Sequence, residues 1–358
     1  MKTGWFKKKI DELSKLKGYK KPDKYSNVIK LDSNENYAVK REFTLDLINQ
    51  TQESLDVREY PLGGTERLVK ALSDYTKIPQ EMIGVGNGSD QIIDLILTNF
   101  ASKETKILTS EPTFGFFEER CKLYSIPTIR IPFTNNMTLD VEKFISNAKK
   151  ANILYLDSPN NPTGFQFTKN ELEKLIREFK GLVIIDEAYV EFADYSVLDL
   201  TKKVDNLIVL RTLSKSFGLA GLRIGYFVTN KKVADVFNKI IQYPYPLNTI
   251  AIESGILALQ KSKYFLDVAN QIKKERSRII EKLRTMKMFE VYDSNANFVL
   301  FVARGSSQRI YKALIEQGIL IKNLGKIGNH EGCLRVTVGS QEMNSKFLSA
   351  IRDLLTWH

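Results

Sequence analysis

The strongest constraint on the fold is a regular alternation of short apolar runs with helix-like segments. The runs "ILYL", "LVII" and "LIVL" are apolar throughout, as strands are when both faces of a parallel sheet are buried. Between the first two lies "TKNELEKLIREFKG", which begins with Thr168, a helix-capping residue, and is closed by Gly181. Strands that alternate with helices predict an α/β fold with a large, mostly parallel sheet.

The pattern changes after about residue 250. Before that point, residues 43–57 and 64–76 have helical spacing, and the alternation of strands and helices runs from there to about residue 250. Beyond 250 a long helical stretch precedes the strand-like runs "FVLFV", "ILIKN" and "CLRVTVGS", which predicts a smaller α+β unit. We therefore expect an N-terminal arm that joins the smaller domain over residues 1–42, a large domain over 43–250 and a small domain over 251–358.

Polar residues follow the apolar runs at four places: Gly86–Asp90, Asp157–Gly164, Asp186–Tyr189 and Thr212–Arg223. Ligands of open α/β sheets bind where the strands end, at one edge of the sheet. The four clusters therefore predict one shared site.

The run "GNGSD" at 86–90 has the form of a phosphate-binding turn. Its glycines allow close approach of the backbone, and the amides at the start of the following helix point outward. Arg223 can bind the same phosphate through two donors, and Thr212 and Ser214 offer hydroxyl groups. Each feature taken singly also fits an ordinary turn, a solvent-facing arginine or a helix cap.

Asp186 and Lys215 add reactive groups to this site. A carboxylate that ends a buried strand is costly unless a cation or hydrogen bonds compensate it, although Asp186 could also be a structural cap. A partly desolvated lysine near other cations can form a Schiff base. A phosphate seat, an amine and an acid together match what pyridoxal 5'-phosphate (PLP) requires: an anchor, an aldehyde partner and a partner for its ring nitrogen.

The bulk composition excludes several other classes of protein. The chain has 358 residues and no apolar run long enough to span a bilayer, and its N-terminus is charged rather than signal-like, so we expect a soluble, cytoplasmic protein without a membrane partner. Two cysteines and two histidines predict neither a disulfide framework nor a histidine-based metal site. The net charge of +11 could indicate nucleic-acid binding, but the lysines are interleaved with acids, which favours a solvated surface and small anionic ligands.

The whole chain, from about residue 15, resembles the fold-type I PLP-dependent aminotransferases and, within them, the histidinol-phosphate aminotransferases. The resemblance is carried by "LDSNEN", "REYPLGG", "GNGSDQ", "EPTFGFF", "SPNNPTG", "IIDEAYVEF", "LRTLSKSFGLAGLRIGY", "YPLN" and "GCLRVTVGS", in the order of the family. It implies the family's fold, with a large PLP-binding domain and a smaller α+β domain, and PLP as the cofactor.

The resemblance also implies roles for individual residues. Lys215 would bind PLP covalently and later act as the base that moves the substrate proton, while Asp186 would keep the ring nitrogen protonated. Tyr189 and Asn161 would hydrogen-bond the ring hydroxyl. The phosphate would be bound by the amides of Gly88, Ser89 and Asp90 and by the side chains of Thr212, Ser214 and Arg223.

Two aromatic assignments follow from the same resemblance. Phe114 would stack on the cofactor ring, with Phe117 as the alternative. Tyr60 in "REYPLGG" would reach the phosphate in the other subunit of a homodimer with shared active sites.

Substrate binding is implied for Arg335, which would bind a carboxylate or the substrate phosphate, and for Asn34. Lys322 replaces an arginine of some family members, and it keeps the charge but loses the planar fork. Tyr19 is the best match for a tyrosine of the N-terminal arm, and it could equally pack on the partner subunit. Tyr37 replaces a proline found in many members.

The implied reaction is the transamination of L-histidinol phosphate with 2-oxoglutarate, which gives imidazole acetol phosphate and L-glutamate in histidine biosynthesis. An aminotransferase for aromatic or other amino acids, or a phospho-amino-acid decarboxylase, would share the same cofactor residues. A nucleic-acid-binding protein is the alternative from another class, because of the net charge.

Overall fold

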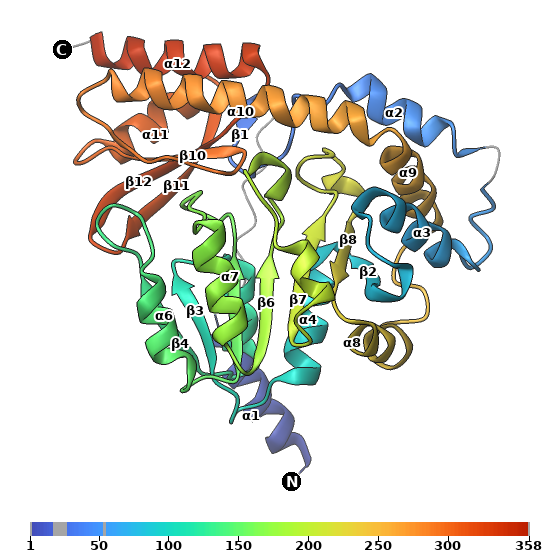
Figure 1. Cartoon of the computed structure of the whole chain (residues 1–358). Helices are drawn as coiled ribbons and strands as arrows, with labels where there is room; N and C mark the ends of the chain where they lie inside the picture. The colour runs from blue at the N-terminus through green and yellow to red at the C-terminus, as the bar shows by residue number, and fades with distance from the viewer. Residues whose placement is uncertain (1, 17–26, 53–54, 357–358) are drawn as a thin grey trace.

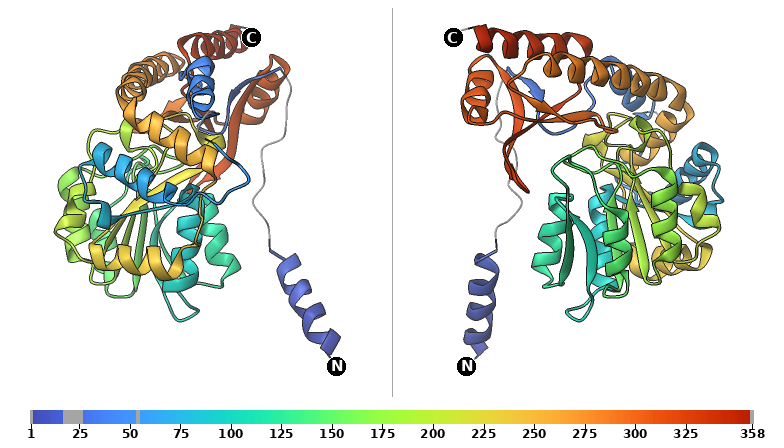
Figure 2. Two further views of the ribbon diagram at one scale, coloured as in Figure 1. Left: turned by 90° about the vertical axis from the view of Figure 1, so that its right-hand side faces the viewer. Right: turned by 60° about the vertical axis from the view of Figure 1, so that its left-hand side comes forward.

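The computed structural model describes residues 2–16, 27–52 and 55–356. They form two domains stacked one above the other, with helix α1 (Lys2–Ser14) lying apart from both (Figures 1 and 2). Among the described helices, none combines the length and the apolar character that crossing a bilayer requires.

The large domain is built on a seven-stranded sheet with the order β2-β8-β7-β6-β5-β3-β4. All neighbouring strands are parallel except β8, which runs antiparallel to both β2 and β7. The prediction of a large, mostly parallel sheet is therefore confirmed. The strands are β2 (Ile83–Asn87), β3 (Ile107–Glu111), β4 (Thr128–Pro132), β5 (Ile153–Asp157), β6 (Leu182–Asp186), β7 (Leu207–Thr212) and β8 (Ile224–Val228).

Helices cover both faces of this sheet, because its central strands are apolar on both sides. One face carries α3 (Gly64–Thr76), α6 (Val141–Ala148), α7 (Lys169–Glu178) and α9 (Thr249–Gln260). The other carries α4 (Gly88–Phe100), α5 (Gly115–Leu123) and α8 (Lys231–Val236). Along β6 the alternation is direct: Val183 and Ile185 belong to the first core, and Ile184 belongs to the second.

The small domain consists of a five-stranded sheet packed against three helices (Figure 1). Its strand order is β1-β11-β12-β10-β9, in which only the β1–β11 pair is parallel. The strands are β1 (Ile29–Leu31), β9 (Glu290–Val291), β10 (Phe298–Val302), β11 (Ile319–Ile327) and β12 (His330–Thr337), and the helices are α10 (Ser262–Arg284), α11 (Ser307–Glu316) and α12 (Gln341–Thr356).

Helix boundaries differ from the sequence expectations in a few places. Thr168 caps α7 through a reciprocal capping box with Glu171, but the helix ends at Glu178, before Gly181. The helix expected over residues 43–57 is shorter in the structure, where α2 spans Arg41–Asn49.

The expected domain boundary at 250/251 also differs from the packing. Helix α9 contributes Ala251, Ile252 and Leu259 to the core of the large domain, and the first turns of α10 contribute Phe265 to the same core. The later turns of α10 pack in the small domain, for example through Ile279. We therefore propose that the boundary lies within α10, which connects the two cores.

Candidate active site

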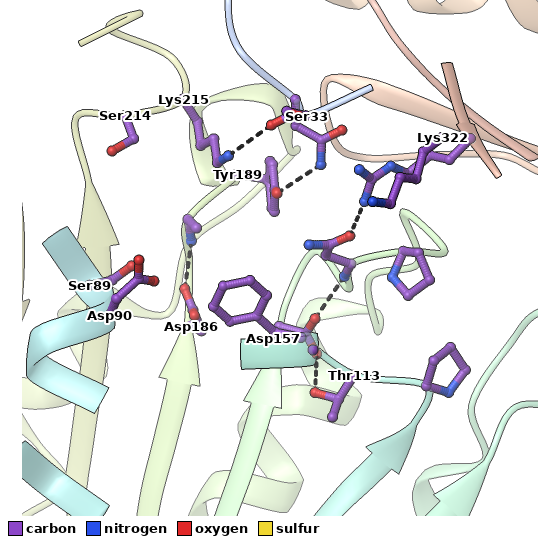
Figure 3. Close-up of a pocket in the computed structure, with 18 of the residues that line it drawn as sticks. Ser33, Ser89, Asp90, Thr113, Asp157, Asp186, Tyr189, Ser214, Lys215 and Lys322 are labelled. Atoms are coloured by element: carbon purple, nitrogen blue, oxygen red, sulfur yellow. Dashed lines mark hydrogen bonds between the residues drawn. The ribbon is translucent and has the colours of Figure 1, made fainter. Parts of the chain in front are cut away.

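A cavity of about 540 Å³ is lined by residues at one edge of the large sheet and by residues of the β11–β12 hairpin. This hairpin extends from the small domain toward the large domain (Figure 2). Strands β2, β3, β5, β6 and β7 run in the same direction, so their carboxyl ends meet at one edge of the sheet, below this cavity. Figure 3 shows side chains from these strand ends converging on the cavity. The four polar clusters found in the sequence are thereby brought together at one edge, as the sheet geometry requires.

Most of the residues expected at the site line this cavity. They are Asn34, Ser89, Asp90, Phe114, Asn161, Asp186, Tyr189, Thr212, Ser214, Lys215, Arg223, Lys322 and Arg335. Gly88 lies directly beside them at the start of α4.

One end of the cavity is built for an anion. Ser89 and Asp90 lie in the first turn of α4, where backbone N–H groups have no partner within the helix. Arg223 lies beside them: its Nη2 is 2.8 Å from Asp90 Oδ2 and its Nη1 is 3.5 Å from Ser214 Oγ. Gly88 has a φ of +72°, and a Cβ there would lie 2.4 Å from Arg223 Nη2, so only glycine allows the guanidinium this position.

Asp186 lies at the end of β6 in the centre of the cavity floor. Its Oδ2 accepts a hydrogen bond from the hydroxyl of Tyr155 (3.1 Å) and its Oδ1 accepts one from the N–H of Ala188 (3.1 Å). Burial raises the pKa of Asp186 to about 7, further helped by nearby Asp157, because these two hydrogen bonds compensate only part of the lost hydration. A buried carboxyl whose lost hydration is only partly replaced favours the binding of a positively charged or N–H-donating partner.

Lys215 projects over the same part of the cavity (Figure 3). Its Nζ donates to the carbonyl oxygen of Ser33 (3.4 Å) and lies 5.6 Å from the centre of the Tyr189 ring. The Tyr189 ring packs edge-on against Phe298 of the small domain, with ring centres 5.2 Å apart. The amine and the phenol hydroxyl therefore both border the space above Asp186.

Asp157 is a site residue to which the sequence assigned no role. It ends β5 opposite Asp186 on β6, and it accepts hydrogen bonds from the Thr113 hydroxyl, the Asn160 amide group and the Asn161 N–H at 2.9, 2.9 and 2.7 Å. Burial raises its pKa to about 6. Asp157 thus fixes the loop that presents Asn161, and the signal in the sequence was an acid that ends a buried apolar run, as at Asp186.

The structure separates the two candidates for ring stacking. Phe114 lines the cavity, whereas Phe117 is buried in the core, stacked on Tyr155 at 3.7 Å between ring centres. Phe114 therefore remains the predicted stacking residue.

Tyr60 does not line the cavity of this chain. Tyr60 is 72% exposed, and its ring stacks on Tyr245 at the surface, with 4.7 Å between centres. Tyr19 lies outside the described residues. The expectation that Tyr60 serves the site of a partner subunit stays a prediction.

The β11–β12 hairpin supplies cations to the roof of the cavity. Lys322 and Arg335 are directly paired across the two strands, so their side chains lie on the same face of the sheet. Arg335 is fixed by hydrogen bonds from Nη1 to Asn161 Oδ1 and from Nη2 to the Asp32 carbonyl oxygen (2.8 Å), and its guanidinium lies 5.1 Å from the centre of the Phe298 ring. A guanidinium fixed beside a lysine makes this part of the cavity its second anion-binding end.

Comparisons with known proteins agree with this fold and site. The family model described as aminotransferase class I and II matches residues 26–351. The histidinol-phosphate aminotransferase of Caldanaerobacter subterraneus subsp. tengcongensis is 34% identical to the chain over 349 residues, which cover 95% of this chain and 97% of that protein. The chain therefore belongs to the class I and II aminotransferases and, within them, to the histidinol-phosphate aminotransferase family.

Solved structures show the same architecture. The histidinol-phosphate aminotransferase of Clostridium acetobutylicum is similar with a TM-score of 0.82 and 29% identity, over 91% of this chain and 99% of that one. The Sinorhizobium meliloti histidinol-phosphate aminotransferase in complex with pyridoxal-5'-phosphate has the same fold at 23% identity, with a TM-score of 0.82 and 91% of each chain covered. The fold is that of the fold-type I PLP-dependent transferases.

Proposed function

We propose that this protein catalyses the PLP-dependent transamination of L-histidinol phosphate with 2-oxoglutarate, giving imidazole acetol phosphate and L-glutamate in histidine biosynthesis. The observation that carries the proposal is a cavity with an anion-binding group at each end and an amine and a buried acid between them (Figure 3). One anion end fits the cofactor phosphate, and the other fits a phosphate or carboxylate of the substrate.

The residues present fit PLP on two structural grounds. Asp186 is a buried carboxyl whose pKa is raised by burial, and a protonated ring nitrogen would supply the charge partner that it needs. Gly88 and Arg223 form an anion seat that an added Cβ at residue 88 would fill. Ser89, Asp90, Thr212 and Ser214 would complete the phosphate contacts, and Phe114 would cover a ring face.

When bound, PLP supplies an electron sink for the negative charge left on the substrate Cα when its proton is removed. Lys215 would hold the cofactor through its amine, and the same amine would serve as the base that takes the Cα proton. Tyr189 and Asn161, which follow the neighbouring strands β6 and β5, would orient the ring through its hydroxyl. Asp186 would pair with the ring nitrogen, and its charge would stabilise the protonated form of that nitrogen.

Arg335 and Lys322 bind the far end of the substrate. Because Arg335 is already held by Asn161 and Asp32, its guanidinium would bind an incoming anion without a large loss of side-chain freedom. The same pair has to accept the phosphate of histidinol phosphate in one half-reaction and a carboxylate of glutamate in the other. A charged hydrogen bond contributes about 1.5–3 kcal/mol, so loss of the phosphate costs about 10- to 150-fold in kcat/KM.

The active protein is a homodimer with shared sites. This part of the proposal is supported by the exposed aromatic pair Tyr60 and Tyr245 and by the exposed side chains Val57 and Leu62 nearby in sequence, which a second copy of the chain would cover. Tyr60 would then reach the phosphate end of the partner's cavity.

The test is a donor screen with the purified, PLP-loaded protein and 2-oxoglutarate. Glutamate formation is measured with histidinol phosphate, histidinol, histidine, phenylalanine and O-phosphothreonine. We expect histidinol phosphate to exceed histidinol and histidine by at least about tenfold in kcat/KM. Equal turnover of phenylalanine would establish a general aminotransferase instead, and release of carbon dioxide from the phospho-amino acid would establish a decarboxylase.

A further inference from the structure

Asn34 occupies a strained position between the two domains, and all of its polar groups are hydrogen-bonded. Its φ of +58° lies in the left-handed region, which asparagine tolerates better than most residues. It is buried, and its carbonyl oxygen accepts a hydrogen bond from Asn297 (3.1 Å). Its N–H donates to Thr337 Oγ1 (3.0 Å), and its side-chain Nδ2 donates to the hydroxyl of Tyr189 (2.9 Å).

Thr337 fixes which way the Asn34 amide faces. The Thr337 hydroxyl oxygen accepts the backbone N–H of Asn34 and donates its own proton to Asn34 Oδ1 (3.3 Å). If the Asn34 amide were turned round, its NH2 group would replace Oδ1 beside Thr337. The Thr337 hydroxyl would then face two N–H donors and would lose the acceptor for its own proton. Buried polar groups are rarely left unsatisfied, so the NH2 group of Asn34 points to Tyr189.

The direction of this hydrogen bond determines where the Tyr189 proton can go. Because the phenol oxygen already accepts from Asn34, its proton is free to donate elsewhere, and among the described residues the Tyr189 hydroxyl makes no other hydrogen bond. Its ring is held by the edge contact with Phe298, on the strand that pairs with Thr337. The hydroxyl borders the cavity beside Lys215, so the available acceptor is a bound ligand.

We propose that Thr337 and Asn34 are positioning residues that force Tyr189 to donate its proton into the cavity, to the ring oxygen of the cofactor. The inference rests on the proposed binding of PLP and goes beyond it, because it assigns the orientation of one hydrogen bond to two residues of the small domain and the N-terminal segment. A hydrogen bond received by the phenol oxygen also strengthens the one that it donates.

The first test compares Thr337→Val with Thr337→Ser, because the valine side chain has the shape of threonine without its hydroxyl and serine retains that hydroxyl. Thr337 is buried and does not line the cavity, so neither variant removes a substrate contact. The readouts are the affinity of the apoprotein for PLP and the pH midpoint of the visible absorption band of the PLP-loaded protein, both without substrate.

Thr337→Val should bind PLP roughly two- to tenfold more weakly than the wild type, because one neutral hydrogen bond is lost. The pH midpoint should rise by roughly 0.3–1 unit in Thr337→Val. In the wild type, the hydrogen bond from Tyr189 stabilises negative charge on the ring oxygen, so this oxygen holds the proton that it shares with the imine less tightly. A weaker hydrogen bond from Tyr189 therefore raises the pKa of the imine. Thr337→Ser should match the wild type in both readouts. An unchanged midpoint in Thr337→Val would overturn the inference.

The second test asks whether the effect passes through Tyr189. In a Tyr189→Phe background, which lacks the phenol hydroxyl, Thr337→Val should change neither the PLP affinity nor the midpoint. A shift of the same size in that background would show that Thr337 acts by another route and would refute the proposal.

If Thr337→Val does not fold, judged by its thermal unfolding, Asn34→Asp takes its place. Its carboxylate cannot donate to Tyr189, and the same comparison in the Tyr189→Phe background separates orientation from the added charge.

The wild-type measurements separate the two proposals. A wild-type protein that binds no PLP would overturn both the proposed function and this inference. A wild-type protein that binds PLP and transaminates, with Thr337→Val indistinguishable from it, would overturn the inference alone.

Discussion

The pH dependence of the stability of the apoprotein tests the environment of Asp186. Burial raises the pKa of this carboxyl from 3.8 to about 7, although Tyr155 and Ala188 donate hydrogen bonds to it. Since the folded-state pKa is above the unfolded value, the folded apoprotein holds the proton more tightly than the unfolded chain. The stability that this provides is complete below about pH 4 and is lost as the pH rises to about 7.

The size of the effect follows from the shift. One pKa unit corresponds to about 1.4 kcal/mol, so the wild-type apoprotein loses about 4 kcal/mol through Asp186 over this range. Asp186→Asn has no charge to bury, and its amide oxygen can still accept the N–H of Ala188. The free energy of unfolding of the variant, relative to the wild type, should therefore rise by about 1.4 kcal/mol per pH unit between pH 5 and 7 and then level off.

The assay is urea unfolding of both apoproteins at pH 5, 6, 7 and 8. Asp157→Asn is the matched control, because burial raises the pKa of Asp157 only to about 6 and its difference from the wild type should level off about one pH unit earlier. Added PLP should reverse the order at pH 8, since only the wild type carries a charge to pair with the ring nitrogen. A difference between Asp186→Asn and the wild type that stays constant from pH 5 to 7 would refute the reasoning.

Lys215→Ala should fold but lose covalent attachment of PLP, measured by borohydride reduction and peptide mass, and labelling that persists at another lysine would contradict the assignment. Lys322→Ala should lower kcat/KM for histidinol phosphate by roughly 10- to 150-fold and affect the glutamate half-reaction less, so equal losses in both would argue against a phosphate role. Mixed dimers of Tyr60→Phe and Lys215→Ala subunits should regain activity over either parent, provided that Tyr60→Phe alone is clearly impaired, and verified hybrids without activity would count against shared sites. Phe114→Leu should weaken the binding of PLP, whereas Phe117→Leu should instead lower the free energy of unfolding by about 1 kcal/mol, and a cofactor defect in the second variant would reverse the assignment.

The sequence by itself determined the large sheet and the edge at which the site forms. Short apolar runs that alternate with helices, such as those of β5 and β6, are typical of strands buried on both faces, and parallel strands bring their carboxyl ends to one edge. Asp186, Lys215 and Arg223 could be placed at this edge because Asp186 ends β6 and the other two lie in the short connection between β7 and β8. Local periodicity and the position of a residue after a strand are properties that a sequence displays.

The tertiary structure decided what these residues contact. Phe114 and Phe117 are three residues apart on one turn, and only the packing of Phe117 on Tyr155 shows which of them faces the cavity. The contacts of Asn34 with Tyr189 and Thr337 join positions 155 and 303 residues apart. Hydrogen bonds of this kind depend on how segments far apart in the chain are brought together, and no local sequence pattern records them.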